Sequence, residues 1–139
     1  MDHWSGWTFH SVEELVDALD DYTRFQGRAK VARLGENEGD GFSLEQWDIA
    51  MRRNKAIDRA MFRLRYTHWL SYRLIDAYYR AGLCNEGGGW ERAMQRAGFR
   101  ACPRGSTVRS YHESTFEVLL AAGHEALFTA HRIRPRRAE

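Results

Sequence analysis

The chain has 139 residues, of which 43% are hydrophobic and 13% aromatic, and its formal net charge is +2. This length suits one domain, and the apolar content can form a buried core, which argues against a disordered chain. No run approaches the roughly 18 apolar residues of a membrane span. The first residues also lack a signal-peptide pattern, so we expect a cytoplasmic protein that does not associate with a membrane. Its two cysteines, Cys84 and Cys102, are expected to be reduced.

The charges are unevenly distributed along the chain. Acidic residues outnumber basic ones in residues 1–48, whereas basic residues, nearly all of them Arg, outnumber acidic ones in residues 49–139. Basic faces attract nucleic acid, and acidic faces avoid it or dock on basic proteins. The alternative is a surface on which the two signs average out in three dimensions.

The first predicted helix starts after Ser11 and runs to about Phe25. Ser11 and Glu14 have the spacing of a capping box, in which the two side chains accept hydrogen bonds from free N–H groups of the first turn. Behind them, apolar residues recur at helical spacing along one face. These residues are Val12, Leu15, Val16 and Leu19. The four glycines of residues 27–42 predict a loop after this helix.

Two further helices follow this loop. Ser43 and Gln46 repeat the capping-box spacing and predict a helix that runs to about Arg65. Its predicted apolar stripe consists of Leu44, Trp47, Met51, Ile57, Met61 and Leu64. The next helix is predicted over 69–81, with Gly82 as its stop. Its stripe consists of Leu70, Leu74, Ala77 and Tyr78.

The last two predicted helices cover 90–98 and about 107–131. The buried side of the final helix is expected to consist of Phe116, Leu119, Leu120, Gly123, Leu127 and Phe128. The sequence therefore predicts an all-α, single-domain bundle of about five helices. It divides into an acidic arm, helix and loop (1–42), a helical bundle (43–131) and a basic, flexible tail (132–139). The expected core residues are Ile57, Met61, Leu64, Leu70, Leu74, Phe116 and Leu120.

Three of these helices come in the order of a helix-turn-helix unit: 69–81, 90–98 and the helix from 107. In such a unit the first helix supports the other two, and the last inserts its N-terminus into the major groove of DNA. The final helix fits this role because polar residues occupy its first turn and apolar residues its later turns. A helix N-terminus also attracts phosphate.

The strings LIDAYYRAG, WERAMQRAGF and STVRSYHESTFEVL carry a resemblance to a known family. Together they resemble the sigma-factor region-four type of helix-turn-helix, which recurs in phage late-gene regulators and Q-type antiterminators. Tyr79 and Gly82 match its first turn, residues 98–99 its second, and 107–110 the head of its recognition helix. The resemblance covers about residues 60–128. It implies a phage or mobile-element regulator of transcription, antiterminator-like, that also contacts RNA polymerase or another host protein.

This interpretation assigns contacts with double-stranded DNA to the last helix and its surroundings. Ser106 and Thr107 are expected to cap the helix and touch phosphate, while Arg109, Ser110 and His112 reach base edges or phosphates. The remaining arginines are expected to follow the phosphates. They are Arg92, Arg96, Arg100, Arg104 and, in the tail, Arg134, Arg136 and Arg137. The alternative for all of them is an ordinary solvated helix face.

The aromatic residues near the N-terminus also have two interpretations. Trp4, Trp7 and Phe9 form either an arm that docks on a protein partner or an arm that packs on the core. The first interpretation suits the alternative function, a small phage-type inhibitor or adaptor that binds a host protein complex without specific DNA binding.

The sequence contains no pattern typical of an active site. A nucleophile at motif spacing from a base, a phosphate-binding loop and an evident pair of catalytic acids are all missing from it. Cys84, Cys102 and His112 lack the spacing of a zinc site. We therefore expect a protein that is not an enzyme and that has no cofactor or metal.

Overall fold

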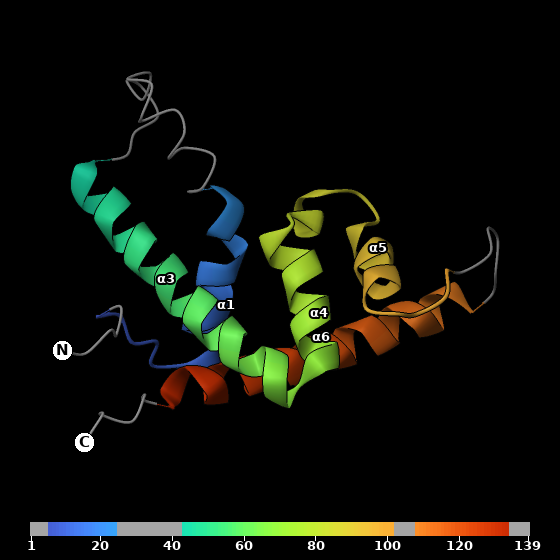
Figure 1. Ribbon diagram of the computed structural model, residues 1–139. Helices are drawn as coiled ribbons and strands as arrows, with labels where there is room; N and C mark the ends of the chain where they lie inside the picture. Colours follow the sequence, from blue (N-terminus) through green and yellow to red (C-terminus); the bar gives the residue numbers. More distant parts are fainter. Residues whose placement is uncertain (1–5, 25–42, 102–107, 134–139) are drawn as a thin grey trace.

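The computed structural model describes residues 6–24, 43–101 and 108–133 (Figure 1). Within these ranges the chain forms helices and no strand, which confirms the predicted all-α fold. The α-helices are α1 (Val12–Asp20), α3 (Leu44–Thr67), α4 (Trp69–Ile75), α5 (Gly89–Arg96) and α6 (Arg109–Arg132). A π-helical turn, η1 (Asp76–Arg80), and a 3-10 turn, η2 (Leu83–Asn85), join α4 to α5. None of the helices in the described ranges combines the length and the apolarity of a membrane span.

Both predicted N-caps are formed. The Ser11 hydroxyl accepts a hydrogen bond from the Glu14 N–H at 3.1 Å, and the Glu14 carboxylate accepts one from the His10 N–H at 3.2 Å. At the start of α3 the Ser43 hydroxyl accepts from the Gln46 N–H at 3.1 Å, and the Gln46 side-chain oxygen accepts from the Ser43 N–H at 2.8 Å. These bonds satisfy donors that the first turn of a helix leaves free.

The predicted helix over 69–81 consists of α4 and its π-helical continuation η1. Gly82 follows with a φ of +84°, a left-handed conformation that glycine adopts without steric cost. The predicted stop at Gly82 is therefore confirmed. The helix predicted over 90–98 begins at Gly89, and the last helix begins at Arg109 rather than near Thr107.

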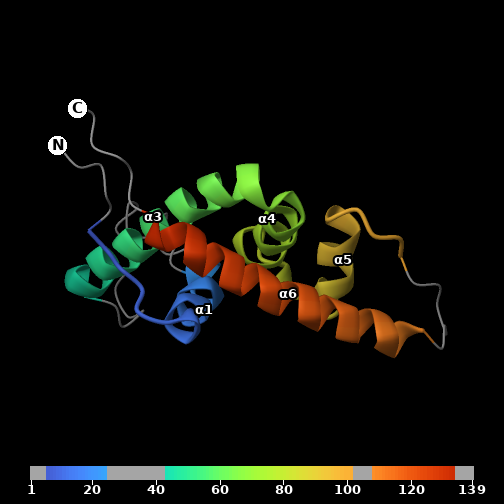
Figure 2. The same cartoon turned by 90° about the horizontal axis from the view of Figure 1, so that it is seen from below.

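Two hydrophobic clusters lie at opposite ends of α6, which runs along the length of the bundle (Figure 2). The first joins α1, α3 and the C-terminal half of α6, and Leu127 is its buried residue on α6. The second joins α4, α5 and the N-terminal half of α6, and includes Leu74, Met94 and Phe116. Tyr78 and Leu120, both half-buried, pack against both clusters and connect them.

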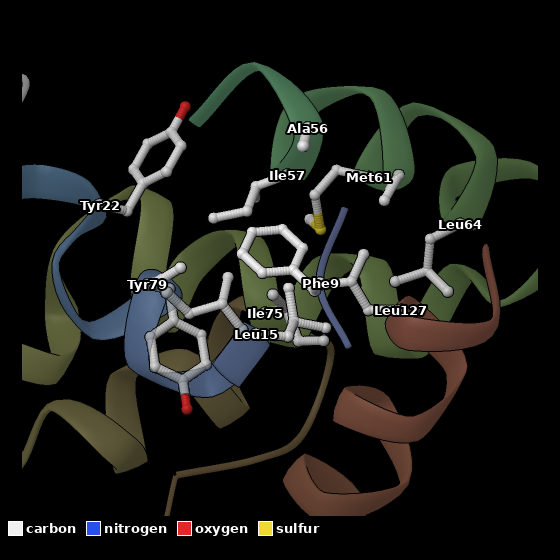
Figure 3. Packing of buried hydrophobic residues seen from close by; sticks show 13 residues of the cluster. Phe9, Leu15, Tyr22, Ala56, Ile57, Met61, Leu64, Ile75, Tyr79 and Leu127 are labelled. Atoms are coloured by element: carbon white, nitrogen blue, oxygen red, sulfur yellow. The ribbon is translucent and has the colours of Figure 1, made fainter. Parts of the chain in front are cut away.

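Phe9 lies inside the first cluster and is 1% exposed. It is surrounded by side chains of α1, α3 and α6, among them Leu15, Ile57 and Leu127 (Figure 3). Its N–H donates to Nε2 of the buried His131 at 2.9 Å, which ties the chain before α1 to the end of α6. The prediction that Phe9 docks on a partner is therefore wrong, because burial in the core leaves no surface for one. Trp7 is half-buried against the same cluster, and Trp4 lies outside the described residues.

The predicted core is confirmed for Ile57, Met61, Leu64, Leu74 and Phe116, which are all buried. The prediction is wrong for Leu70, which is 39% exposed. Leu70 shares the helical face of Leu74 and Ala77, but it lies one turn earlier, outside the second cluster. Two residues of the predicted α3 stripe, Leu44 and Met51, are also exposed.

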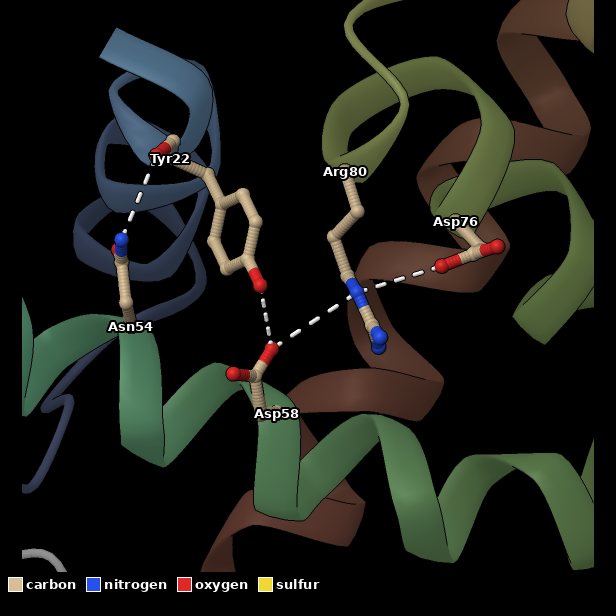
Figure 4. Close-up of polar contacts among 5 residues, drawn as sticks. All are labelled: Tyr22, Asn54, Asp58, Asp76 and Arg80. Atoms are coloured by element: carbon tan, nitrogen blue, oxygen red, sulfur yellow. Dashed lines mark hydrogen bonds and ion pairs between the residues drawn. The ribbon is translucent and has the colours of Figure 1, made fainter. Parts of the chain in front are cut away.

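A polar network fastens α3 to the segments on either side of it (Figure 4). The Tyr22 hydroxyl donates to the Asp58 carboxylate at 2.7 Å, and the amide of buried Asn54 donates to the Tyr22 carbonyl at 3.3 Å. Arg80 of η1 pairs with Asp58 at 3.7 Å and with Asp76 at 3.2 Å. One arginine thus pairs with two carboxylates and compensates one of their two negative charges.

Candidate nucleic-acid interface

The helices α4, α5 and α6 form a three-helix unit with a cluster of its own. Leu74 and Ala77 from α4 and η1, Ala93 and Met94 from α5, and Phe116 from α6 are buried together. In both views the first turns of α6 extend beyond α5 (Figures 1 and 2). The unit therefore combines a packed base with a projecting helix end, which is what a groove-binding helix requires.

The start of α5 is held closely against η2. A Cβ added at Gly89 would lie 1.7 Å from the carbonyl oxygen of Leu83, so only glycine fits there. The end of α5 turns through Gly98, whose φ is +107°. The connection from Arg96 to Arg109 is longer than the short turn typical of helix-turn-helix units.

Several predicted DNA-contacting residues lie outside the described residues. These are Arg104, Ser106, Thr107, Arg134, Arg136 and Arg137. The N-cap of α6 is Val108, which makes no side-chain cap hydrogen bond. Ser110 lies in the first turn of α6.

Arg109 opens α6 and turns toward α5. Its guanidinium forms an ion pair with Glu91 and lies 5.6 Å from the centroid of the Trp90 ring, a cation–π distance. The side chain is still 53% exposed. Arg109 is therefore held in place at the head of α6, by which we mean the first turns of this helix, residues 109–118. Its guanidinium remains partly exposed to solvent.

The other described candidates lie on α5, just after it, or on the first turns of α6. Arg92 donates to Glu86 at 2.6 Å, and the carbonyl of Arg96 accepts a hydrogen bond from Arg73 at 2.5 Å. His112 is half-buried and lines a shallow depression together with Trp90, Glu91 and Arg100. The structure thus places His112 and Arg100 in the same depression, and Arg109 contacts Trp90 and Glu91 from its lining.

The outward face of the α6 head consists of residues that the sequence prediction did not select. Tyr111 is 72% exposed, and Ser114 and Val118 are exposed on the same side. Their spacing could have identified this exposed face, because positions 111, 114 and 118 lie opposite Phe116, Gly123 and Leu127 on a helical projection. Tyr111 carries both a flat ring and a hydroxyl, so it suits contact with either a base or a protein.

A second exposed aromatic group lies at the corner where α3 meets α4, and the sequence prediction missed it too. Phe62, Tyr66 and Trp69 all expose more than half of their side chains there. The sequence feature that could have revealed this group is the run from Arg59 to Ile75, which contains basic residues, no acidic residue and all three of these aromatics.

Among the described residues, no three His, Cys, Asp or Glu side chains are grouped so as to hold a metal ion. Comparisons with family models, with curated proteins and with solved structures find no match to this chain.

Proposed function

We propose that this chain binds double-stranded DNA through its three-helix unit and regulates transcription, as the resemblance to sigma region four implies. One observation carries the proposal: α4, α5 and α6 share the second cluster, and the first turns of α6 project beyond α5. Arg109 and Tyr111 are the described side chains best placed to meet a duplex at that end. The tail arginines Arg134, Arg136 and Arg137 would add contacts with phosphates.

The same proposal assigns a protein contact to α1. Glu13, Asp17 and Asp20 are exposed on this helix, away from the buried Leu15 and Leu19. Partial burial raises the pKa of Asp20, and the nearby charges of Asp17 and Asp21 raise it further. An acidic face of this kind suits a basic protein surface, and RNA polymerase or another host protein is the partner we propose.

The test uses a random-sequence duplex library, because the target sequence is not known in advance. Repeated selection with the full chain should enrich a defined sequence. Binding of the enriched duplex and of a random duplex is then measured over a series of salt concentrations. Arg109→Ala should weaken binding to the enriched duplex by about 1–3 kcal/mol, since a good Arg–base contact discriminates by that amount. Removal of the tail arginines should weaken both duplexes alike and flatten the salt dependence.

The ion pair with Glu91 supplies a sharper comparison. Glu91→Gln removes the charge that competes for Arg109, so it should preserve or strengthen duplex binding, whereas Arg109→Ala weakens it. Lys55→Ala removes an equal charge from α3, far from the α6 head, and serves as the matched control. If the wild-type chain binds no duplex near physiological salt, or if Lys55→Ala weakens sequence-specific binding as much as Arg109→Ala, the proposal is wrong.

One observation favours a second candidate function. Glu91 compensates the charge of Arg109, and Tyr111 and Val118 are exposed on the first turns of α6. Exposed apolar and aromatic side chains of this kind also form the centre of protein interfaces. The second candidate is therefore an adaptor or inhibitor that binds a host protein complex through this face. Absence of duplex binding, together with binding of host RNA polymerase that Tyr111→Ala abolishes, would select it.

A further inference from the structure

The corner between α3 and α4 exposes two aromatic pairs. At the end of α3, the Phe62 and Tyr66 rings meet edge to face with their centroids 5.4 Å apart. At the start of α4, the Trp69 and Tyr72 rings are stacked at 5.5 Å with an angle of 22° between their planes. Only His68 and Thr67 separate the two pairs along the chain. Tyr66 is 71% exposed and Trp69 53%, so aromatic side chains are accessible on both sides of the corner.

Each aromatic pair carries an arginine. The guanidinium of Arg65 lies 5.8 Å from the centroid of the Tyr66 ring, and that of Arg73 lies 5.7 Å from the centroid of the Trp69 ring. Arg73 also donates to the carbonyl of Arg96 at the end of α5, which fixes its position. A guanidinium has five N–H donors, so this bond leaves others to bind a further acceptor.

Basic residues outnumber acidic ones at the corner. No acidic residue occurs between Asp58 and Asp76, while four arginines do. Arg63 is engaged by the carbonyls of Ala130 and Ile133 at the end of α6, so its role is structural. Asp58 and Asp76, which border the run, are both paired with Arg80. The surface between them is therefore basic and aromatic.

An open depression of about 190 Å³ adjoins the second aromatic pair. It lies between α4 and the end of α5, and is lined by Trp69, Tyr72, Arg73, Asp76, Ala77 and Arg96. One water molecule occupies about 30 Å³ of liquid, so the depression has room for a much larger group. Its lining combines two aromatic side chains and two cationic ones with the carboxylate of Asp76, which pairs with Arg80.

We propose that this corner binds single-stranded nucleic acid, with bases stacked on Phe62, Tyr66 and Trp69 and with the backbone phosphates beside Arg65 and Arg73. Proteins that bind single strands without sequence preference combine exposed aromatic rings with a positively charged path for the backbone. An acidic protein partner would satisfy the charge, but it would not require ring faces on both sides of the corner. The α3–α4 corner is separate from the α6 head, so this site does not depend on the duplex site proposed above.

The test measures the fluorescence anisotropy of a labelled single-stranded oligothymidine titrated with the full chain. Trp69→Ala should weaken binding by roughly 5-fold to 100-fold, since each stacked base contributes about that much when its aromatic partner is removed. Trp69→Phe keeps a ring and should keep most of the binding. Part of the tryptophan quenching that accompanies binding in the wild type should disappear in Trp69→Phe, because a stacked base quenches that indole.

A control variant separates the corner from the rest of the surface. Leu44→Ala changes an exposed apolar residue at the far end of α3. It should not change oligothymidine binding. The proposal is overturned if the single strand does not bind near physiological salt. It is also overturned if Trp69→Ala binds like the wild type while Arg65→Glu with Arg73→Glu abolishes binding, because that pattern fits a purely electrostatic surface for an acidic protein. If the chain binds oligothymidine but no duplex, the result contradicts the proposed duplex site on α6 and supports the proposed site at the α3–α4 corner.

Discussion

At the scale of single residues, the buried His131 and the half-buried His124 make the stability of the fold depend on pH. Nε2 of His131 accepts the Phe9 N–H, so that nitrogen carries no proton. Burial, followed by the nearby charges of Arg63 and Arg132, lowers the pKa of His131. Burial also lowers the pKa of His124, whose Nε2 lies 2.8 Å from the Tyr79 hydroxyl. Both side chains are therefore held neutral in the folded chain.

This arrangement predicts a loss of stability in mild acid. The unfolded chain takes up protons at histidine near pH 6.5, and the folded chain takes them up only at lower pH. The free energy of unfolding should therefore fall as the pH drops below about 6.5, because the unfolded state binds more protons there. Urea unfolding at a series of pH values measures this slope. His131→Gln, which keeps an acceptor for Phe9, should flatten it. An unchanged slope in that variant would show that His131 is not responsible.

The different burial of two leucines on α4 leads to a second prediction at the residue scale. Leu74 is fully buried in the second cluster, whereas Leu70, one turn earlier on the same helix, is exposed. Leu74→Ala should lower the free energy of unfolding by about 2–5 kcal/mol, the usual cost of truncating a buried leucine. Leu70→Ala should cost about 1 kcal/mol or less, as changes at exposed positions do. Equal losses in chemical unfolding would mean that Leu70 is covered.

At the scale of elements, the contact between η2 and α5 depends on one glycine. A Cβ at Gly89 would meet the Leu83 backbone, whereas a Cβ at Gly87, two residues earlier in the same turn, would meet nothing within 4 Å. Gly89→Ala must shift α5 and should destabilise the chain by roughly 1–3 kcal/mol, the usual cost of overpacking. Gly87→Ala is the matched control and should change stability little. Thermal unfolding of the two variants compares them, and similar melting temperatures would contradict this packing.

The positions of the helices could be predicted from the sequence better than the contacts between them. Ser11, Ser43 and Gly82 identify helix ends because capping depends on residues a few positions apart. Periodicity also indicates the buried face of a helix, but it does not indicate which turns of that face another helix covers, and Leu70 was misjudged for this reason. The ion pair of Arg109 with Glu91 joins residues far apart in the chain. Such a contact depends on how α5 and α6 pack, so local spacing does not reveal it.

At the scale of the whole molecule, α6 connects the two hydrophobic clusters. Leu120 and Tyr78 contact both, so neither cluster can lose its packing without disturbing the other. We expect a single cooperative unfolding transition, monitored in parallel by circular dichroism and tryptophan fluorescence. Phe116→Ala in one cluster and Leu127→Ala in the other should each move the whole transition to lower denaturant concentration. Two separated transitions in either variant would show that the clusters unfold independently.

The central claim is that the head of α6 contacts double-stranded DNA, and site-specific photocrosslinking tests it most directly. A benzophenone amino acid replaces Tyr111 in one variant and Leu44, at the start of α3, in another, since both positions are exposed. After irradiation with the duplex enriched from the random library, the variant with the crosslinker at position 111 should form a covalent protein–DNA adduct, and the variant with it at position 44 should not. Duplex that binds both variants but forms no adduct at position 111, or as much adduct at position 44, would contradict the claim.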